Sequence, residues 1–111
     1  MAYVVKVTDP AARDAEEYRA YILRQSNDSV TADAWWFRLL EAILSLENLP
    51  GRCPRIEERD NFDLPLQQLL YASHRILFWI EGQTVTVARI YPSAARPLRS
   101  LRQRPKHSNP A

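Results

Sequence analysis

The sequence of 111 residues has few of the groups that cross-link small proteins or catalyse reactions in them. A single cysteine, Cys53, excludes an internal disulfide, and with His74 and His107 as the two histidines no metal-ligand spacing can be written, so we expect no metal or other cofactor. Two glycines that do not cluster exclude a glycine-rich phosphate loop. No apolar run approaches the ~20 residues that cross a bilayer, and the N-terminus lacks a signal pattern, so we predict a cytoplasmic protein with no membrane contact.

Acidic residues are missing from the last fifth of the chain. The net charge is only +2, but from Arg89 onward there are six basic side chains and no acidic one, so the preceding 88 residues carry nine basic and thirteen acidic side chains, a net of −4. A positive field concentrated at one end attracts an anionic partner, or it is simply solvated. The six basic residues are Arg89, Arg96, Arg99, Arg102, Arg104 and Lys106.

Apolar residues make up 46% of the chain and charged residues 25%, which is typical of one packed domain. A β-branched and aromatic start predicts a strand over residues 3–7, and Asp9 followed by Pro10 predicts a helix N-terminus with Asp9 as the cap. Apolar residues at helical spacing predict that this helix reaches residue 25. Ser29 is expected to cap a second helix, which carries a broad apolar face and ends at Pro50.

The rest of the chain is expected to be mainly β. Residues 51–65 have no apolar period and are predicted to form a long surface loop. Residues 66–72, 74–81 and 84–91 are predicted as three antiparallel strands, the last two joined by a short hairpin. The fold class is therefore α+β: one twisted sheet with an antiparallel helical hairpin on one face. We expect residues 1–99 to form the domain and residues 100–111 a basic tail, whose order the sequence leaves open.

The strand over residues 74–81 carries apolar side chains on both faces. Ile76, Phe78 and Ile80 alternate with Arg75, Leu77 and Trp79, and two helices cover only one face of a sheet. We therefore predict an exposed apolar groove with a charged rim, a kind of surface that marks a partner site. The alternative is that the segment from Pro92 folds back and covers this face.

Two further positions have an open interpretation. Simple alternation from Val85 and Val87 would bury the charge of Arg89 beside the helices, so we expect a bulge, a partner carboxylate or a shifted register there. Adjacent tryptophans point about 100° apart on a helix, so at most one of Trp35 and Trp36 sits at the centre of the core-facing stripe. The other is a candidate anchor for a partner.

The order of these elements, together with particular residues, resembles the RelE/ParE toxins of bacterial type II toxin–antitoxin systems. The likeness covers residues 3 to about 99. It includes Thr8-Asp9-Pro10-Ala11-Ala12, Asp14 and Tyr18 in the first helix, Leu49-Pro50 after the second, Ser73-His74-Arg75-Ile76-Leu77-Phe78, and Val85-Thr86-Val87-Ala88-Arg89-Ile90-Tyr91.

The resemblance implies a toxin that is neutralised by a cognate antitoxin, with a toxin–antitoxin heterotetramer as one possible assembly. It also implies one of two targets: ParE-like members bind DNA gyrase, whereas RelE-like members cut mRNA on the ribosome. A non-toxic binding module of the same fold is the third alternative. The predicted partner-binding residues are Arg75, Leu77, Trp79, Arg89, Tyr91 and Trp35.

The RNA-cutting mechanism needs a proton acceptor, a proton donor and cations at the scissile phosphate. Arg75, Arg96 and Tyr91 are the catalytic candidates by resemblance, but arginine does not exchange its proton. RelE-like sites place lysines ahead of the arginine-bearing strand, whereas here the two lysines are Lys6 and Lys106. The histidine that relatives often carry after Tyr91 is replaced by Pro92. These departures favour the ParE-like branch, which makes the chain a gyrase inhibitor rather than an enzyme.

Overall fold

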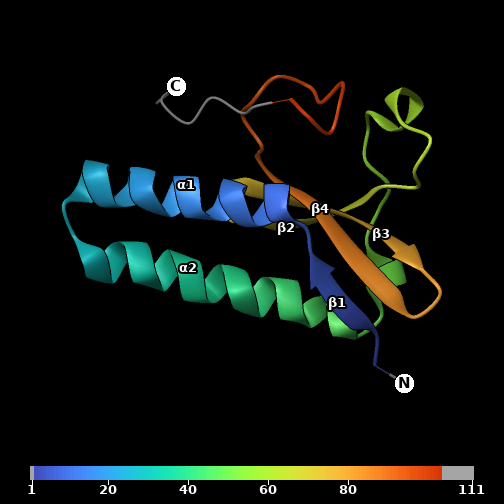
Figure 1. The fold of residues 1–111 in the computed structure, drawn as a ribbon, viewed down its shortest axis with the longest axis horizontal. Helices are drawn as coiled ribbons and strands as arrows, with labels where there is room; N and C mark the ends of the chain where they lie inside the picture. Colours follow the sequence, from blue (N-terminus) through green and yellow to red (C-terminus); the bar gives the residue numbers. More distant parts are fainter. Residues whose placement is uncertain (1, 104–111) are drawn as a thin grey trace.

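The computed structural model describes residues 2–103, in which a four-stranded mixed sheet carries two antiparallel helices on one face (Figure 1). This confirms the predicted α+β fold. The main elements in chain order are β1 (Val4–Val7), α1 (Asp9–Ser26), α2 (Ser29–Leu44), β2 (Gln67–Tyr71), β3 (His74–Glu81) and β4 (Thr84–Pro92).

The first helix begins at Asp9, one residue earlier than the sequence analysis predicted. The N-cap is Thr8, not Asp9, because the Thr8 hydroxyl oxygen accepts a hydrogen bond from the Ala11 amide at 3.3 Å. The same hydroxyl lies 2.9 Å from the Val87 carbonyl oxygen, to which it donates. A threonine does both, whereas an aspartate carboxylate only accepts. Thr8 therefore joins the start of α1 to β4.

The cap of α2 was also misplaced by one residue. Asp28, not Ser29, is the N-cap, and its carboxylate accepts from the Val30 amide at 3.0 Å. The α-helix ends at Leu44 rather than at Pro50, and the chain continues through short 3₁₀ turns at Ser45–Glu47 and Pro50–Arg52. The apolar spacing predicted a longer helix. Leu46 continues that spacing and is buried, but it lies in a 3₁₀ turn after the end of the α-helix.

The strand order is β1-β4-β3-β2. The predicted meander is confirmed, since β2 pairs with β3 and β3 with β4 in antiparallel fashion, and Gly82 adopts φ +60° in the β3–β4 turn. β1 pairs in parallel with β4, with Val4 opposite Thr84 and Val7 opposite Val87. The connection between these two neighbouring parallel strands contains the helical hairpin, the long loop, β2 and β3.

A β-bulge in β4 resolves the position of Arg89. Leu77 pairs with Arg89 and Phe78 with Val87, which leaves Ala88 as the extra residue of β4. After the bulge, Ile90 lies in the core beneath the helices and Tyr91 in the core on the opposite face. Both the bulge and the partner carboxylate that the sequence suggested are present, the latter being Asp14.

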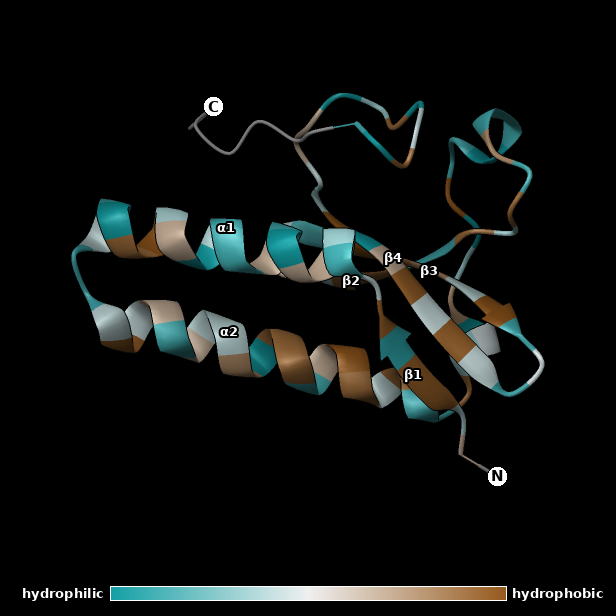
Figure 2. Cartoon of the chain, viewed as in Figure 1, coloured by the Kyte–Doolittle hydropathy of each residue, from teal (hydrophilic) through white to brown (hydrophobic). Residues whose placement is uncertain are grey.

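Each face of the sheet has its own core. The helix-side core is the larger and joins both helices to β3 and β4, where Figure 2 shows brown, apolar bands on these elements. We call the opposite face the far face. Its core consists of Ile56, Leu66, Leu77, Ala88, Tyr91 and Leu98, with Phe62, Trp79, Ala95 and Leu101 packed at the edge.

The far face is covered, so the predicted exposed groove was wrong. Leu77 is 0% exposed and Tyr91 1%. The cover consists of the loop before β2 and of residues 93–103, which we call the strap. This is the alternative in which the segment after Pro92 folds back. Residues 100–103 of the predicted tail belong to the strap, and the remainder of that tail, including Arg104 and Lys106, lies outside the described residues.

Two absences hold for residues 2–103. None of the described helices is long and apolar enough to span a membrane. Within the same range there is no cluster of three or more metal-ligating side chains.

Cys53 is a free, buried thiol whose pKa is raised by desolvation.

Candidate functional site

The most deeply buried charges of the described chain form an ion pair between β4 and α1. Arg89 Nε and Nη2 each donate to a carboxylate oxygen of Asp14 at 2.7 Å, and both side chains are less than a tenth exposed. The Ile90 amide donates to the same carboxylate at 3.0 Å. The hydrogen bonds that Arg89 donates to Asp14 raise the pKa of Arg89 above its usual value. This pair ties the first helix to the bulged strand.

The guanidinium of Arg89 also fastens the strap. Its Nη1 donates to the backbone carbonyls of Leu101 and Gln103. Tyr91 acts next to it, because its hydroxyl donates to the Arg96 carbonyl at 2.9 Å and accepts from the Gln103 side-chain amide at 2.6 Å. The strap is therefore held through its backbone by two side chains of β4.

A second ion pair lies at the other side of the far face and joins β3 to the loop before β2. Arg75 donates from Nη1 and Nη2 to the two carboxylate oxygens of Glu58, at 2.8 and 2.6 Å, and from Nε to Gln68 at 2.8 Å. Glu58 also accepts from the Leu98 amide of the strap at 2.9 Å. The charge-assisted hydrogen bonds from Arg75 lower the pKa of Glu58 to about 2. The guanidinium of Arg75, a predicted catalytic and partner-binding residue, is thus bound by side chains of the chain itself.

The pKa of Glu58 predicts a loss of stability in acid. A carboxyl group with a depressed folded pKa stabilises the fold above its unfolded pKa, 4.5, and this contribution disappears as the pH falls through about 2. The side chain is only 10% exposed, so the contribution can reach about 3 kcal/mol. Urea unfolding at pH 5 and pH 3 should show a decrease in the wild type. The Glu58→Gln variant should be less stable than the wild type at pH 5, and its unfolding free energy should change much less between pH 5 and pH 3. If the variant loses as much stability as the wild type, other carboxyl groups cause the loss.

The three catalytic candidates differ in their surroundings. Arg75 is bound to Glu58, and Tyr91 is buried with its hydroxyl used by the strap. Burial raises the pKa of Tyr91, which makes its phenolate harder to form. Arg96 is exposed on the strap and contributes its backbone carbonyl, not its guanidinium, to the Tyr91 contact.

The two tryptophans of α2 lie on the helix side of the sheet, away from the other predicted partner residues. Trp35 and Trp36 are both half-buried, so neither is fully in the core nor fully exposed. The Trp35 ring is 5.0 Å from that of Tyr18 and 5.6 Å from the buried ring of His74, measured between centroids. Trp35 is therefore part of an aromatic cluster that joins α1, α2 and β3.

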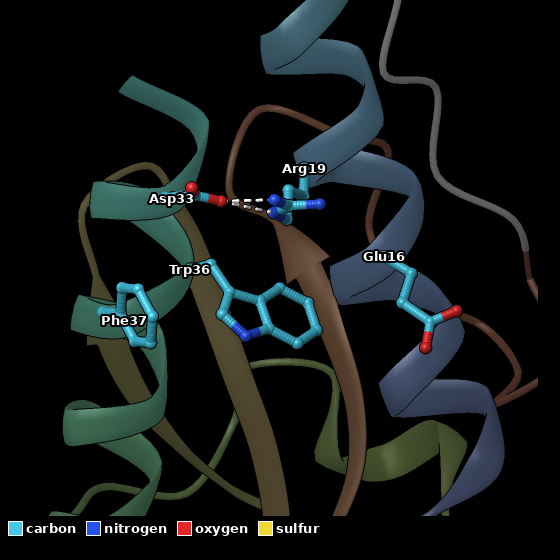
Figure 3. A pocket seen from close by; sticks show the side chains of 5 residues that line it. All are labelled: Glu16, Arg19, Asp33, Trp36 and Phe37. Carbon is cyan, nitrogen blue, oxygen red and sulfur yellow. Dashed lines mark hydrogen bonds and ion pairs between the residues drawn. The ribbon is translucent and has the colours of Figure 1, made fainter. Parts of the chain in front are cut away.

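A groove of about 400 Å³ opens between the two helices. Figure 3 shows the Trp36 ring at its floor, with Glu16 and Arg19 from α1 and Asp33 and Phe37 from α2 around it. Arg19 and Asp33 form an ion pair across the groove, with side chains 40% and 45% exposed. The groove has an aromatic floor and a charged rim that bridges the helices.

An exposed apolar row runs along α2 beside this groove. Phe37 is 62% exposed, and its neighbours in the row are at intervals of three or seven residues, on the side of the helix opposite the buried Leu39 and Ile43. A row of this kind on a surface helix has no explanation in the packing of residues 2–103. We call it the α2 stripe, and it consists of Val30, Phe37, Leu40 and Leu44.

The structure divides the predicted partner-binding residues. Arg75, Leu77, Trp79, Arg89 and Tyr91 come together on the far face, but in the free chain the loop and strap cover them. Sequence reasoning missed Asp14 and Glu58 as their partners, since both carboxylates are distant in sequence. It also missed the α2 stripe, although the seven-residue interval from Val30 to Phe37 to Leu44 was a usable signal.

Comparisons with known proteins agree with this architecture. A solved structure described as "Chromosomal ParDE TA system from P. aeruginosa" superimposes with a TM-score of 0.65 at 16% identity, covering 80% of this chain and 94% of that one. At this identity the match shows a shared fold. No match was found among curated proteins.

The sequence comparison is more specific. The family model for the "ParE toxin of type II toxin-antitoxin system, parDE" matches residues 5–97. The fold is that of a toxin from such a system, and the chain belongs to the ParE toxin family. A cognate antitoxin is therefore its expected partner.

Proposed function

We propose that this toxin acts by binding DNA gyrase and does not cut RNA. The observation that carries the proposal is that the side chains of Arg75 and Tyr91 are bound by other groups of the chain. Cleavage by a 2′-hydroxyl needs groups that take up and release protons. Tyr91 is buried with its hydroxyl in two hydrogen bonds, and Arg75 keeps its proton and faces Glu58. An inhibitor that binds needs only a stable surface, which these contacts support.

The α2 stripe is the proposed contact for the antitoxin. The far face is already filled by the strap, whereas the stripe and the adjoining groove are open. Apolar side chains rimmed by charges suit an amphipathic segment laid along the helices, with its apolar face on Phe37 and polar groups reaching Arg19 and Asp33. Antitoxin binding here leaves the ion pairs of the far face intact.

Supercoiling of relaxed plasmid by purified gyrase tests the proposed target. We expect the wild-type toxin to block the reaction, and antitoxin added first to restore it. In a parallel reaction with ribosomes and mRNA, the RNA should remain full length. Tyr91→Phe keeps the buried ring but removes the hydroxyl, so it should still block supercoiling. If the wild-type toxin cuts the mRNA and the Tyr91→Phe variant leaves it intact, the toxin is a ribonuclease and the proposal is refuted.

A further inference from the structure

The groove between α1 and α2 contains a carboxylate whose charge is not neutralised by the described chain. Glu16 of α1 lines the groove, is exposed, and forms no ion pair among residues 2–103. Asp33, the other carboxylate of the groove, is paired with Arg19, so these two charges offset each other. Two carboxylates and one guanidinium give the lining a net charge of −1. The uncompensated charge is that of Glu16.

The floor of the same groove is the aromatic ring of Trp36. The ring packs on the helix-side core and is half-buried. Figure 3 shows it between the two helices, with Glu16 on the α1 side. Among aromatic side chains, tryptophan attracts a cation most strongly, at up to about 6 Å from the ring centre. The groove therefore offers a carboxylate and an aromatic ring to the same ligand.

We infer that the groove binds a cationic side chain of the antitoxin, an arginine or a lysine, which lies against Trp36 and pairs with Glu16. An anionic side chain would add a like charge beside Glu16. An apolar side chain would displace water from the Glu16 carboxylate without replacing its hydrogen bonds. A cationic side chain avoids both costs, because its polar hydrogens bind the carboxylate and its stem covers the ring.

This inference rests on the proposed antitoxin contact at the α2 stripe and names a partner residue for it. Phe37 belongs to both surfaces, since it lines the groove and lies in the middle of the stripe. An antitoxin helix with its apolar face on the stripe thus has one border of that face at the groove. The cationic residue is expected there, three or four positions from an apolar residue that contacts Phe37. The apolar contacts supply affinity, and the ion pair selects the antitoxin.

Titration calorimetry of the full toxin with its cognate antitoxin tests the role of Glu16. Glu16→Gln keeps the size of the side chain and removes its charge, so it should weaken binding about tenfold at low salt. The difference from the wild type should shrink at high salt, where the ion pair is screened. The matched control, Glu57→Gln, makes the same charge change at an exposed position of the loop before β2 and should bind like the wild type. Circular dichroism verifies that both variants fold.

Substitutions in the antitoxin identify the cationic residue. Each arginine and lysine of its toxin-binding segment is replaced by methionine in turn. One replacement should weaken binding to the wild-type toxin about tenfold but have little further effect on binding to Glu16→Gln. This loss of additivity is the signature of a direct pair. Each of the other replacements should have the same effect on both toxins.

The outcomes separate this inference from the proposed function. Wild-type affinity of Glu16→Gln, equal weakening by Glu57→Gln, or additive effects for every cationic residue of the antitoxin would overturn the inference. If Phe37→Glu still weakens binding in that case, the α2 stripe remains the antitoxin contact. If neither Glu16 nor Phe37 affects binding, the proposed antitoxin contact fails as well. Inhibition of gyrase is measured without antitoxin and does not depend on these results.

Discussion

Arg89→Met is expected to destabilise the toxin by about 3–5 kcal/mol, because it leaves the Asp14 carboxylate buried without a countercharge. The Ile90 amide still donates to Asp14, but one neutral donor does not replace a guanidinium that makes two charge-assisted bonds. The strap also loses the donors that hold Leu101 and Gln103. Urea unfolding at pH 7, followed by circular dichroism, measures the change.

Two controls test the cause of this effect. Arg19→Met removes one side of the half-exposed pair with Asp33 and should cost less than about 1 kcal/mol. Adding Asp14→Leu to Arg89→Met removes the unpaired charge and should recover a large part of the lost stability. If the double variant is as unstable as Arg89→Met alone, the cost comes from lost packing or from release of the strap.

Phe37→Glu is expected to weaken antitoxin binding by about 30-fold or more, which corresponds to about 2 kcal/mol for a central interface residue. Phe37 is 62% exposed at the middle of the α2 stripe, so the substitution should leave the unfolding free energy nearly unchanged. A glutamate there places a charge against the apolar segment of the antitoxin. Titration calorimetry of the toxin with its antitoxin measures the affinity.

Leu70→Glu is the matched control for Phe37→Glu. Leu70 is similarly exposed, at 64%, but lies on β2, at the edge of the sheet. It should bind the antitoxin with wild-type affinity. Equal weakening by the two variants, or none by Phe37→Glu, would show that the antitoxin binds elsewhere, for instance on the far face after the strap has been displaced.

Local patterns in the sequence predicted most of the fold. β3 has the predicted bounds, and the helical hairpin and the meander follow from spacing and turn residues. The errors occur where tertiary contacts decide at which residue a helix begins or ends. Thr8 replaces Asp9 as the cap because its hydroxyl also reaches β4, and α2 shortens where Leu46 is buried in a 3₁₀ turn.

The candidate site was less predictable because its contacts join distant parts of the chain. Asp14 and Arg89 are 75 positions apart, and Glu58 and Arg75 are 17 apart. Sequence analysis expected a partner to satisfy the apolar and charged side chains of the far face. Asp14, the loop that carries Glu58, and the strap satisfy them instead. The apolar side chains of the strap recur every three residues, a period that matches neither the helix nor the strand repeat.

Expression of the toxin in bacteria without its antitoxin tests the central claim most directly. A reporter plasmid extracted from arrested cells should have lost negative supercoiling, while the reporter mRNA remains full length. Co-expression of the antitoxin should restore growth and supercoiling. Cleaved mRNA with normal plasmid supercoiling would contradict the claim that this toxin acts by binding gyrase, and unimpaired growth would contradict toxicity itself.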